Sequence, residues 1–480
     1  MKLAILGYGA EGKSVEKYFK THPYENVAPE DIEIKIFDNF SDEEIDSLGL
    51  EDYDVVFRSP SVRPHYDYRK FSTDDNHASN EGDYKLENKK PYWTSATKYF
   101  FEHCPCEIIA VSGTKGKGTT CSLIKALLDA IVKFSYSNGE SANKSTKNSS
   151  VLPKNYLVGN IGVPALDVLD KITALDDVIY EMSSFQLWDL HASSFIGVLL
   201  RIEPDHLNVH KDFDEYVYAK SAISRYKTEN DYLIYFRNNP TTATLAEKSI
   251  AHKLAYPTDD SHKDVPEIST SGKEKLKTLL DCLKVPGKHN RENAEAALLA
   301  VAARCYHGDL DGLLHSELYP ALEHALKNFE GLPHRCEFVR ELNGVSYYDD
   351  NYSTTFPSID VAIKTFADVP TILIAGGKDK GTDITEIKKC IFKSKNVKKA
   401  ILIGETARSL SAGEDDSKYE FADNLEDAVS RAQELAEEIS KDSEAHKSVV
   451  LMSPAFASFD MFNSYGERGD LFKKYVNALK

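Results

Sequence analysis

Residues 113–120 carry the strongest chemical signal in the chain. They read Gly-Thr-Lys-Gly-Lys-Gly-Thr-Thr, directly after the apolar run at 107–111 and before a helical pattern. Backbone N–H groups of such a turn, with the N-terminus of the following helix, bind phosphate oxygens, and a lysine adds positive charge. Val111 occupies the place of the first glycine of a strict Walker sequence, so composition and context together predict a nucleotide site.

Within this loop, Lys117 is the residue expected to lie against the β- and γ-phosphates. A helix hydroxyl, from Thr119 or Thr120, would bind Mg²⁺, which prefers oxygen ligands. The loop residues expected to contact ATP are Gly113, Thr114, Lys115, Gly116, Lys117, Gly118, Thr119 and Thr120.

Three further polar residues follow the loop in order. Glu181 ends an apolar strand pattern, His206 lies in Glu-Pro-Asp-His-Leu, and Lys220 lies in Tyr-Ala-Lys-Ser. A carboxylate at the end of a strand suits a second Mg²⁺ ligand. Taken singly, the three residues could equally be a capping acid, a structural histidine and a surface lysine.

The N-terminus offers a second glycine motif. Gly-Tyr-Gly-Ala-Glu-Gly at residues 7–12 fits GxGxxG, and Asp38 ends the second strand pattern. Alone, these features predict an NAD-dependent dehydrogenase. That alternative leaves the second phosphate loop and the series from Glu181 to Lys220 unexplained.

The ordered motifs resemble the Mur ligase family over nearly the whole chain, and within it the ligases that add D-glutamate to UDP-N-acetylmuramoyl-L-alanine. The motifs are GTKGKGTT from residue 113, GNIG from 159, YEMSSFQL from 180, EPDHL from 203, YAKS from 218, GKHN from 287, GLPHR from 331, the Asp pair at 349–350, GGKDKG from 376 and SPAFAS from 453. The resemblance implies an ATP-dependent amide ligase of peptidoglycan precursor synthesis that forms an acyl phosphate. Another Mur-type ligase, a folylpolyglutamate synthase and a non-catalytic nucleotide sensor remain alternatives.

The resemblance also implies roles for individual residues. The catalytic residues would be Lys117, His206 and Lys220. The metal ligands would be Thr119, Glu181, His206 and Lys220, holding two Mg²⁺ ions, with Lys220 carbamylated. ATP would also contact Asn290, Asn293, Arg335 and Asp350. The UDP-linked substrate would contact Ala10, Glu11, Asp38, Asn39, Ser59 and Asn160. The amino acid would contact Thr354, Lys380, Ser458 and Tyr465.

Two positions depart from the family pattern. Gly118 stands where Ser or Thr usually follows the loop lysine, which leaves Thr119 to supply the magnesium hydroxyl. Tyr352 stands where the family usually has a lysine, so the positive charge expected there is missing.

Strand and helix patterns alternate along the chain, which predicts an α/β fold with largely parallel sheets and ligands beyond the carboxyl ends of the strands. By resemblance, the chain has three domains with an active site between them. These are a Rossmann-like UDP-substrate domain at 1–103, a P-loop-type ATPase domain at 104–330, and a Rossmann-like amino-acid domain at 331–480.

The composition limits the partners. The net charge of −18 argues against a nucleic-acid binder. Neither a secretion signal nor an apolar membrane span is apparent, and the sparse cysteines suit reduced thiols. We therefore expect a cytoplasmic monomer that binds small-molecule substrates.

Overall fold

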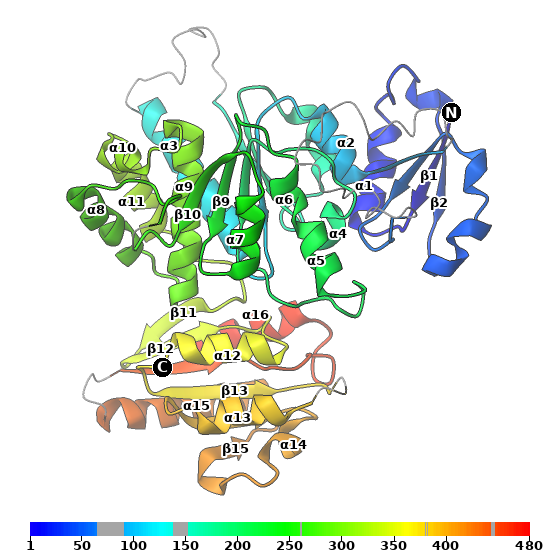
Figure 1. The fold of residues 1–480 in the computed structure, drawn as a ribbon. Helices are drawn as coiled ribbons and strands as arrows, with labels where there is room; N and C mark the ends of the chain where they lie inside the picture. The colour runs from blue at the N-terminus through cyan, green and yellow to red at the C-terminus, as the bar shows by residue number, and fades with distance from the viewer. Residues whose placement is uncertain (65–90, 138–151, 260–261, 380, 382, 443–446) are drawn as a thin grey trace. The chain divides into compact units, whose positions relative to one another are not determined.

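The computed structural model describes residues 1–64, 91–137, 152–259, 262–379, 381, 383–442 and 447–480 (Figure 1). The chain divides into two compact units. Unit 1 comprises residues 1–282 and 292–327, and unit 2 comprises residues 283–291 and 328–480. Both units combine helices with sheets that are mainly parallel.

The first sheet of unit 1 has four parallel strands in the order β2-β1-β3-β4. The strands are β1 (Lys2–Leu6), β2 (Glu33–Phe37), β3 (Val55–Arg58) and β4 (Tyr92–Ser95), and the helices are α1 (Ala10–Phe19) and α2 (Ala96–His103). Alternate residues of β1 belong to different cores: Leu3 and Ile5 to one, Ala4 and Leu6 to the other. This period of two is what a sheet covered on both faces requires.

The second sheet of unit 1 has six parallel strands in the order β10-β9-β8-β5-β7-β6. Its strands are β5 (Ile108–Ser112), β6 (Asn155–Gly159), β7 (Asp177–Glu181), β8 (Ile196–Leu199), β9 (Tyr232–Phe236) and β10 (His252–Tyr256). Its helices are α3 (Lys117–Ser137), α4 (Ser184–Leu187), α5 (Phe213–Lys220), α6 (Ala222–Arg225), α7 (Pro240–Glu247), α8 (Thr270–Asp281), α9 (Lys288–Tyr306), α10 (Leu310–His315) and α11 (Tyr319–Lys327). Strands β5 and β7 are neighbours and are buried along their whole length.

Unit 2 contains a six-stranded sheet in the order β11-β12-β16-β13-β14-β15, in which only the β11–β12 pair is antiparallel. The strands are β11 (Glu337–Leu342), β12 (Val345–Asp349), β13 (Thr371–Gly376), β14 (Val397–Ile403), β15 (Tyr419–Phe421) and β16 (Ser448–Met452). Helices α12 (Phe356–Thr365), α13 (Thr385–Lys393) and α14 (Ala407–Ser411) pack on one face, and α15 (Leu425–Asp442) and α16 (Tyr465–Ala478) on the other (Figure 1).

These observations confirm the α/β fold with largely parallel sheets. Unit 1 contains the sheets of both the first and the second predicted domain, and the division into three domains stays a prediction. Among the residues described, no helix combines the length and apolar character needed to cross a membrane.

Candidate active site

The glycine loop between β5 and α3 has a backbone that only glycine accommodates well. Gly113 and Gly116 adopt φ angles of +153° and +87°. A Cβ atom on Gly113 would lie 2.6 Å from Leu200 Cβ, and one on Gly116 would lie 2.6 Å from Asn293 Oδ1. The loop therefore keeps its backbone close to neighbouring groups, as phosphate binding through N–H groups requires.

Lys117 opens helix α3 and turns back over the loop. Its Nζ donates hydrogen bonds to the carbonyl oxygens of Gly113 and Thr114, each at 3.0 Å. The ammonium group thus lies at the N-terminus of a 21-residue helix, where the helix dipole also favours an anion. This is the placement expected for a phosphate-binding lysine.

Thr114 connects the loop to the segment that follows β8. Its hydroxyl donates to Glu203 O at 3.0 Å, accepts from Glu203 N at 2.9 Å, and lies 3.0 Å from the hydroxyl of Tyr216. Tyr216 belongs to α5, the helix that ends at Lys220. Thr114 therefore couples the loop to the element that carries the buried lysine.

Lys220 is only 1% exposed and lies directly beneath the loop. Its Nζ donates to Gly113 O at 2.8 Å and to Ser112 Oγ at 3.4 Å. Burial lowers the pKa of Lys220 well below its ordinary value, and the nearby charge of Lys117 lowers it further. The fold therefore favours a neutral amine at this position.

Glu181 ends β7, next to the strand that precedes the loop. Its Oε1 accepts a hydrogen bond of 2.9 Å from Asn160 Nδ2. The charges of Glu181 and Asp205 both act on the ammonium of Lys220, opposing the lowering of its pKa. The structure thus brings Glu181, Asp205 and Lys220 together around the loop.

His206 lies at the rim of this cluster. Its φ of +55° is a left-handed conformation, and its ring lies 5.2 Å from the ring of Phe185. Partial burial lowers the pKa of His206, and Lys117 and Lys220 lower it further against the opposing charge of Asp205. A neutral imidazole, which can accept a proton, is the favoured form at neutral pH.

These residues fit a magnesium nucleotide. The loop offers backbone N–H groups and Lys117, while Glu181 and the half-buried Thr119 offer the oxygen ligands that Mg²⁺ prefers. The hydroxyl of Thr120 is buried and has no hydrogen-bond partner among the described residues. Either threonine can supply the hydroxyl that Gly118 lacks.

The glycine turn after β1 forms a second candidate site. Gly7 has φ +81°, and a Cβ atom on Gly12 would lie 2.2 Å from Gly7 O. Ser59, which follows β3, donates to Gly7 O at 2.6 Å, and Tyr8 N donates to Asp38 at 3.2 Å. In this strand order, β1 and β3 flank the topological switch point where ligands bind.

The predicted UDP-substrate residues are therefore not all at one place. Ala10, Asp38, Asn39 and Ser59 follow the strand ends of the first sheet, and all except Ser59 are exposed. The carboxyl of Glu11, in the same glycine turn, is buried and accepts a hydrogen bond of 2.6 Å from Gln186 of α4. Asn160, in contrast, directly follows β6 of the second sheet.

In unit 2, Asp350 follows β12 in a buried position. Its carboxylate accepts hydrogen bonds from Cys336 N at 3.1 Å and from Ser453 Oγ at 2.8 Å. Burial, the largest cause, raises the pKa of Asp350 to about 6. Arg335 is exposed, with its guanidinium carbon 5.8 Å from the ring centroid of Tyr352.

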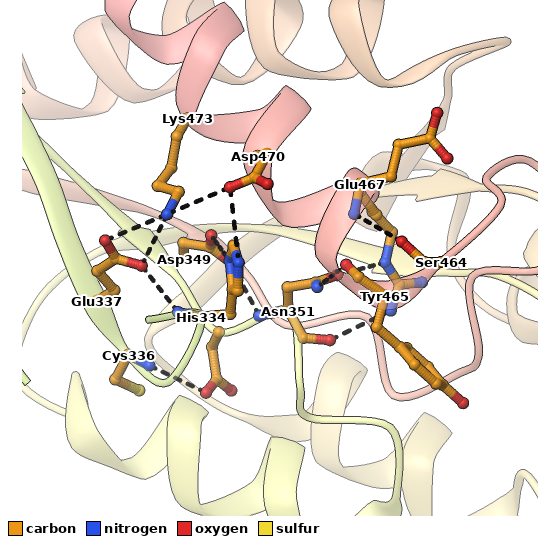
Figure 2. A network of polar contacts seen from close by, with 12 residues as sticks. His334, Cys336, Glu337, Asp349, Asn351, Ser464, Tyr465, Glu467, Asp470 and Lys473 are labelled. Carbon is orange, nitrogen blue, oxygen red and sulfur yellow. Dashed lines mark hydrogen bonds and ion pairs between the residues drawn. The ribbon is translucent and has the colours of Figure 1, made fainter. Parts of the chain in front are cut away.

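The sequence motifs did not indicate the polar network around His334 that Figure 2 shows. The imidazole of His334 lies 2.7 Å from Asp349 through Nδ1 and 3.7 Å from Asp470 through Nε2. A Cβ atom on Gly469 would lie 2.2 Å from His334 Nδ1, so α16 needs a glycine there. Glu337 joins this network, because it accepts a hydrogen bond of 2.8 Å from His334 N and pairs with Lys473 at 3.2 Å.

The amino-acid candidates also lie in unit 2. Ser458 is fully buried, and its Oγ has no hydrogen-bond partner among the described residues. Thr354 and Tyr465 are half-buried, and the ring of Tyr465 lies 6.4 Å from that of Tyr352. Lys380 lies outside the described residues.

The ATP candidates outside the loop fall in both units. Asn293 belongs to unit 1 and packs against Gly116. Asn290, Arg335 and Asp350 belong to unit 2, where Asn290 Nδ2 donates to Pro286 O at 2.7 Å.

Two family models match the chain. The model described as Mur ligase middle domain covers residues 111–301, and the one described as Mur ligase, glutamate ligase domain covers residues 334–456. The first match includes the loop, Glu181 and Lys220, and the second includes Arg335 and Asp350.

Curated relatives extend the similarity. The UDP-N-acetylmuramoylalanine–D-glutamate ligase of Caldicellulosiruptor saccharolyticus is 35% identical over 78% of this chain and 76% of its own length. The ligase of the same name from Acetivibrio thermocellus is 32% identical over 90% and 84%. A third, from Clostridium kluyveri, is 27% identical and covers 100% of this chain and 97% of its own.

Solved structures share the fold. A MurF ligase from Thermotoga maritima in complex with ADP superposes with a TM-score of 0.51 at 13% identity, covering 91% of this chain and 92% of its own. The Mycobacterium tuberculosis folylpolyglutamate synthase complexed with ADP and AMPPCP gives 0.50 at 14% identity, covering 78% and 94%. At these identities the likeness concerns architecture alone.

Proposed function

The chain belongs to the Mur ligase family, and we propose that it joins D-glutamate to UDP-N-acetylmuramoyl-L-alanine in peptidoglycan precursor synthesis. It is an ATP-dependent ligase that forms a carbon–nitrogen bond. The observation that carries the proposal is the cluster around the glycine loop, where Lys117, Glu181 and Lys220 meet.

The first step is transfer of the γ-phosphoryl group of ATP to the alanyl carboxylate, which gives an acyl phosphate and ADP. Lys117 and the loop N–H groups hold the phosphates, and Arg335 carries a forked, permanent charge suited to phosphate oxygens. Mg²⁺ held by Thr119 and Glu181 would offset the negative charge of the transferring group. Within unit 1, Lys117 already lies against the glycine loop, hydrogen-bonded to Gly113 O and Thr114 O.

In the second step, the amine of D-glutamate attacks the acyl carbon, the carbon–oxygen bond to phosphate breaks, and the amide forms. The attacking amine must lose a proton. His206 suits this role, since its lowered pKa keeps the imidazole neutral and ready to accept one. Ser458, Thr354 and Lys380 are the residues proposed to bind the two carboxylates of the amino acid.

Lys220 is proposed to act as a carbamate. Its neutral amine adds CO₂ and releases a proton, giving a carboxylate-like group at the end of α5. Burial and the neighbouring charge of Lys117 favour the neutral amine that this reaction needs. The hydrogen bonds of the unmodified amine to Gly113 O and Ser112 Oγ, at the phosphate loop, support this proposal.

Tyr352 bears on the choice of amino acid. A tyrosine offers a neutral hydroxyl where the family usually has a lysine, so the second carboxylate of D-glutamate would rely on Lys380 and Ser458. The alternative is a Mur-type ligase for another amino acid, and it predicts turnover with that amino acid rather than D-glutamate.

The decisive experiment measures phosphate release from ATP with UDP-N-acetylmuramoyl-L-alanine and a panel of D- and L-amino acids. The proposal requires release with D-glutamate, together with the amide product in a mass spectrum. Phosphate release only with L-lysine or diaminopimelate would show that the enzyme catalyses a different ligation step. No release with any amino acid would contradict the ligase function.

The carbamate is tested by mass spectrometry of peptides containing Lys220, from enzyme held in ¹³C-bicarbonate and trapped by alkylation of the carbamate oxygen. A labelled adduct on Lys220 is expected. Lys227 is a matched control, because it is also buried with a pKa lowered to about 7 but hydrogen-bonds to Ser194 Oγ at 2.9 Å. An active enzyme with unmodified Lys220 would refute the carbamate.

A further inference from the structure

A buried ion pair joins the two sheets of unit 1. Arg58, the last residue of β3, donates from Nε to Asp189 Oδ2 at 2.6 Å and from Nη2 to Asp189 Oδ1. The same guanidinium donates to Phe185 O and to Val62 O, each at 3.0 Å. Arg58 is 2% exposed, so the pair lies in the interior.

A second polar contact crosses the same boundary. Gln186 donates from Nε2 to Glu11 Oε1 at 2.6 Å, while its Oε1 accepts from Ser183 N at 2.8 Å. Glu11 lies in the first turn of α1, inside the GxGxxG turn. The side-chain amide of Gln186 therefore links the glycine turn of the first sheet to the N-cap of α4.

The two contacts end on the same short segment. Phe185 and Gln186 lie in α4, which begins three residues after Glu181, and Asp189 lies two residues after the end of this helix. On the other side, Arg58 precedes Ser59, which is bonded to Gly7 O at 2.6 Å. Each sheet thus contributes the segment next to its own candidate site.

We propose that Arg58, Asp189, Glu11 and Gln186 are positioning residues that fix the glycine turn of the first sheet relative to Glu181 and the phosphate loop. The inference rests on the proposed function, in which that turn holds the UDP-linked acid and the loop holds ATP. The network sets where the acid's carboxylate lies when it meets the γ-phosphate.

The chemistry of the contact supports this role. Apolar burial holds two surfaces together without direction, whereas a bidentate guanidinium–carboxylate pair fixes both distance and angle. Such a buried pair adds little net stability compared with apolar residues of the same size. Its contribution is geometry, which is what alignment of a carboxylate with a phosphorus atom needs.

The test replaces both charges with apolar residues of similar size, Arg58→Met together with Asp189→Leu, so that neither charge is left buried alone. We expect the melting temperature and the Kd of a non-hydrolysable ATP analogue to stay close to wild type. The turnover number for phosphate release with UDP-N-acetylmuramoyl-L-alanine should fall roughly tenfold to a hundredfold, because an error of about 1 Å in alignment has that effect.

The matched control is the pair of Arg304 and Asp177, 2.5 Å apart at the other end of β7. Arg304→Met with Asp177→Leu removes an ion pair at the end of β7 away from Glu181, without touching the first sheet, and should leave turnover unchanged.

The outcomes separate the proposals. Wild-type turnover by a folded Arg58→Met/Asp189→Leu variant overturns the positioning role while leaving the ligase function intact. If the variant's melting temperature and its affinity for the ATP analogue fall together with turnover, the pair has a merely structural role. That result would also overturn the positioning role. Failure of the wild-type enzyme to release phosphate with any amino acid would instead overturn the proposed function.

Discussion

Among the described residues of unit 1, two lysines are buried, and their surroundings differ. Lys220 donates to Gly113 O in the phosphate loop, whereas Lys227 donates to Ser194 Oγ in the segment before β8. Burial lowers the pKa of both. Of these two lysines, Lys220 is therefore the one that combines a lowered pKa with a position beside the proposed phosphates.

We predict that Lys220→Met lowers turnover roughly 10- to 100-fold, the usual effect of losing a group that supports a metal ligand. A short carboxylic acid such as formate, added in excess, should restore part of the activity by standing in for the carbamate. Steady-state phosphate release checks both effects. Lys227→Met is the control, and its turnover per folded molecule should match wild type.

Asp350 makes a second residue-scale prediction. Its pKa is raised from 3.8 to about 6, mainly by burial, so the fold disfavours the charged form. A group of this kind stabilises the fold most fully below about pH 4, and that contribution is lost as the pH rises to about 6. Asp350→Asn, which cannot ionise, should escape this loss.

Relative to Asp350→Asn, the unfolding free energy of the wild type should therefore fall by about 2–3 kcal/mol between about pH 4 and pH 7. Urea unfolding at a series of pH values measures the difference. A constant difference across this range would contradict the raised pKa. The variant should also bind ATP less tightly if Asp350 contacts the nucleotide.

At the scale of single residues, the sequence motifs indicated candidate residues but not the surroundings of their side chains. The motif around Lys220 indicated a role, but burial beneath the loop depends on how α5 packs, which no local pattern reveals. His334 stood in a recognised motif, yet its partner Asp470 lies 136 residues later on a helix. A polar pair between residues far apart in the chain produces no repeating pattern in the sequence from which it could be predicted.

At the scale of elements, the loop between β5 and α3 is defined by its glycines. Gly116 combines a left-handed φ with close packing against Asn293. Gly413 has a similar φ of +78°, but a Cβ atom there would meet nothing within 4 Å. Substituting alanine at each position therefore distinguishes the effect of backbone strain alone, at Gly413, from strain together with steric crowding, at Gly116.

We predict that Gly116→Ala weakens binding of an ATP analogue about tenfold or more, equivalent to about 1.4 kcal/mol. Gly413→Ala should cost roughly 1–2 kcal/mol of folding stability through strain alone and leave nucleotide affinity unchanged. Isothermal titration and urea unfolding check the pair. Equal affinities for the two variants would argue against the loop as the nucleotide site.

The sequence predicted where strands form more closely than it predicted the surroundings of individual side chains. The apolar run at residues 107–111 predicted β5, because strands covered on both faces are apolar throughout. The strand order of the sheets did not follow, since pairing depends on long-range contacts. That order is what places Glu181 next to the loop.

At the scale of the molecule, the candidate sites fall on three sheets in two units. The first sheet offers the turn at 7–12, the second offers the loop at 113–120, and unit 2 offers Asp350 and Ser458. The separation predicts that each ligand protects a different part of the chain.

Hydrogen exchange tests this prediction. The UDP-linked substrate alone should slow exchange of the amides in residues 7–12, and an ATP analogue alone should slow exchange in residues 113–120. Each ligand at about 100 times its Kd should raise the unfolding free energy by about 2.7 kcal/mol if it binds only the folded state. Protection of the same segment by both ligands would contradict the assignment of separate sites.

The ion pair of Arg58 with Asp189 and the contact of Glu11 with Gln186 also limit how the chain can be recombined. Each joins residues far apart in the sequence, 131 positions in the first case and 175 in the second. A chimera that takes its first hundred residues from a relative would bring one half of each contact and keep the other. Exchange of this module should therefore succeed only when the donor carries both partners, or when Asp189 and Gln186 are exchanged with it.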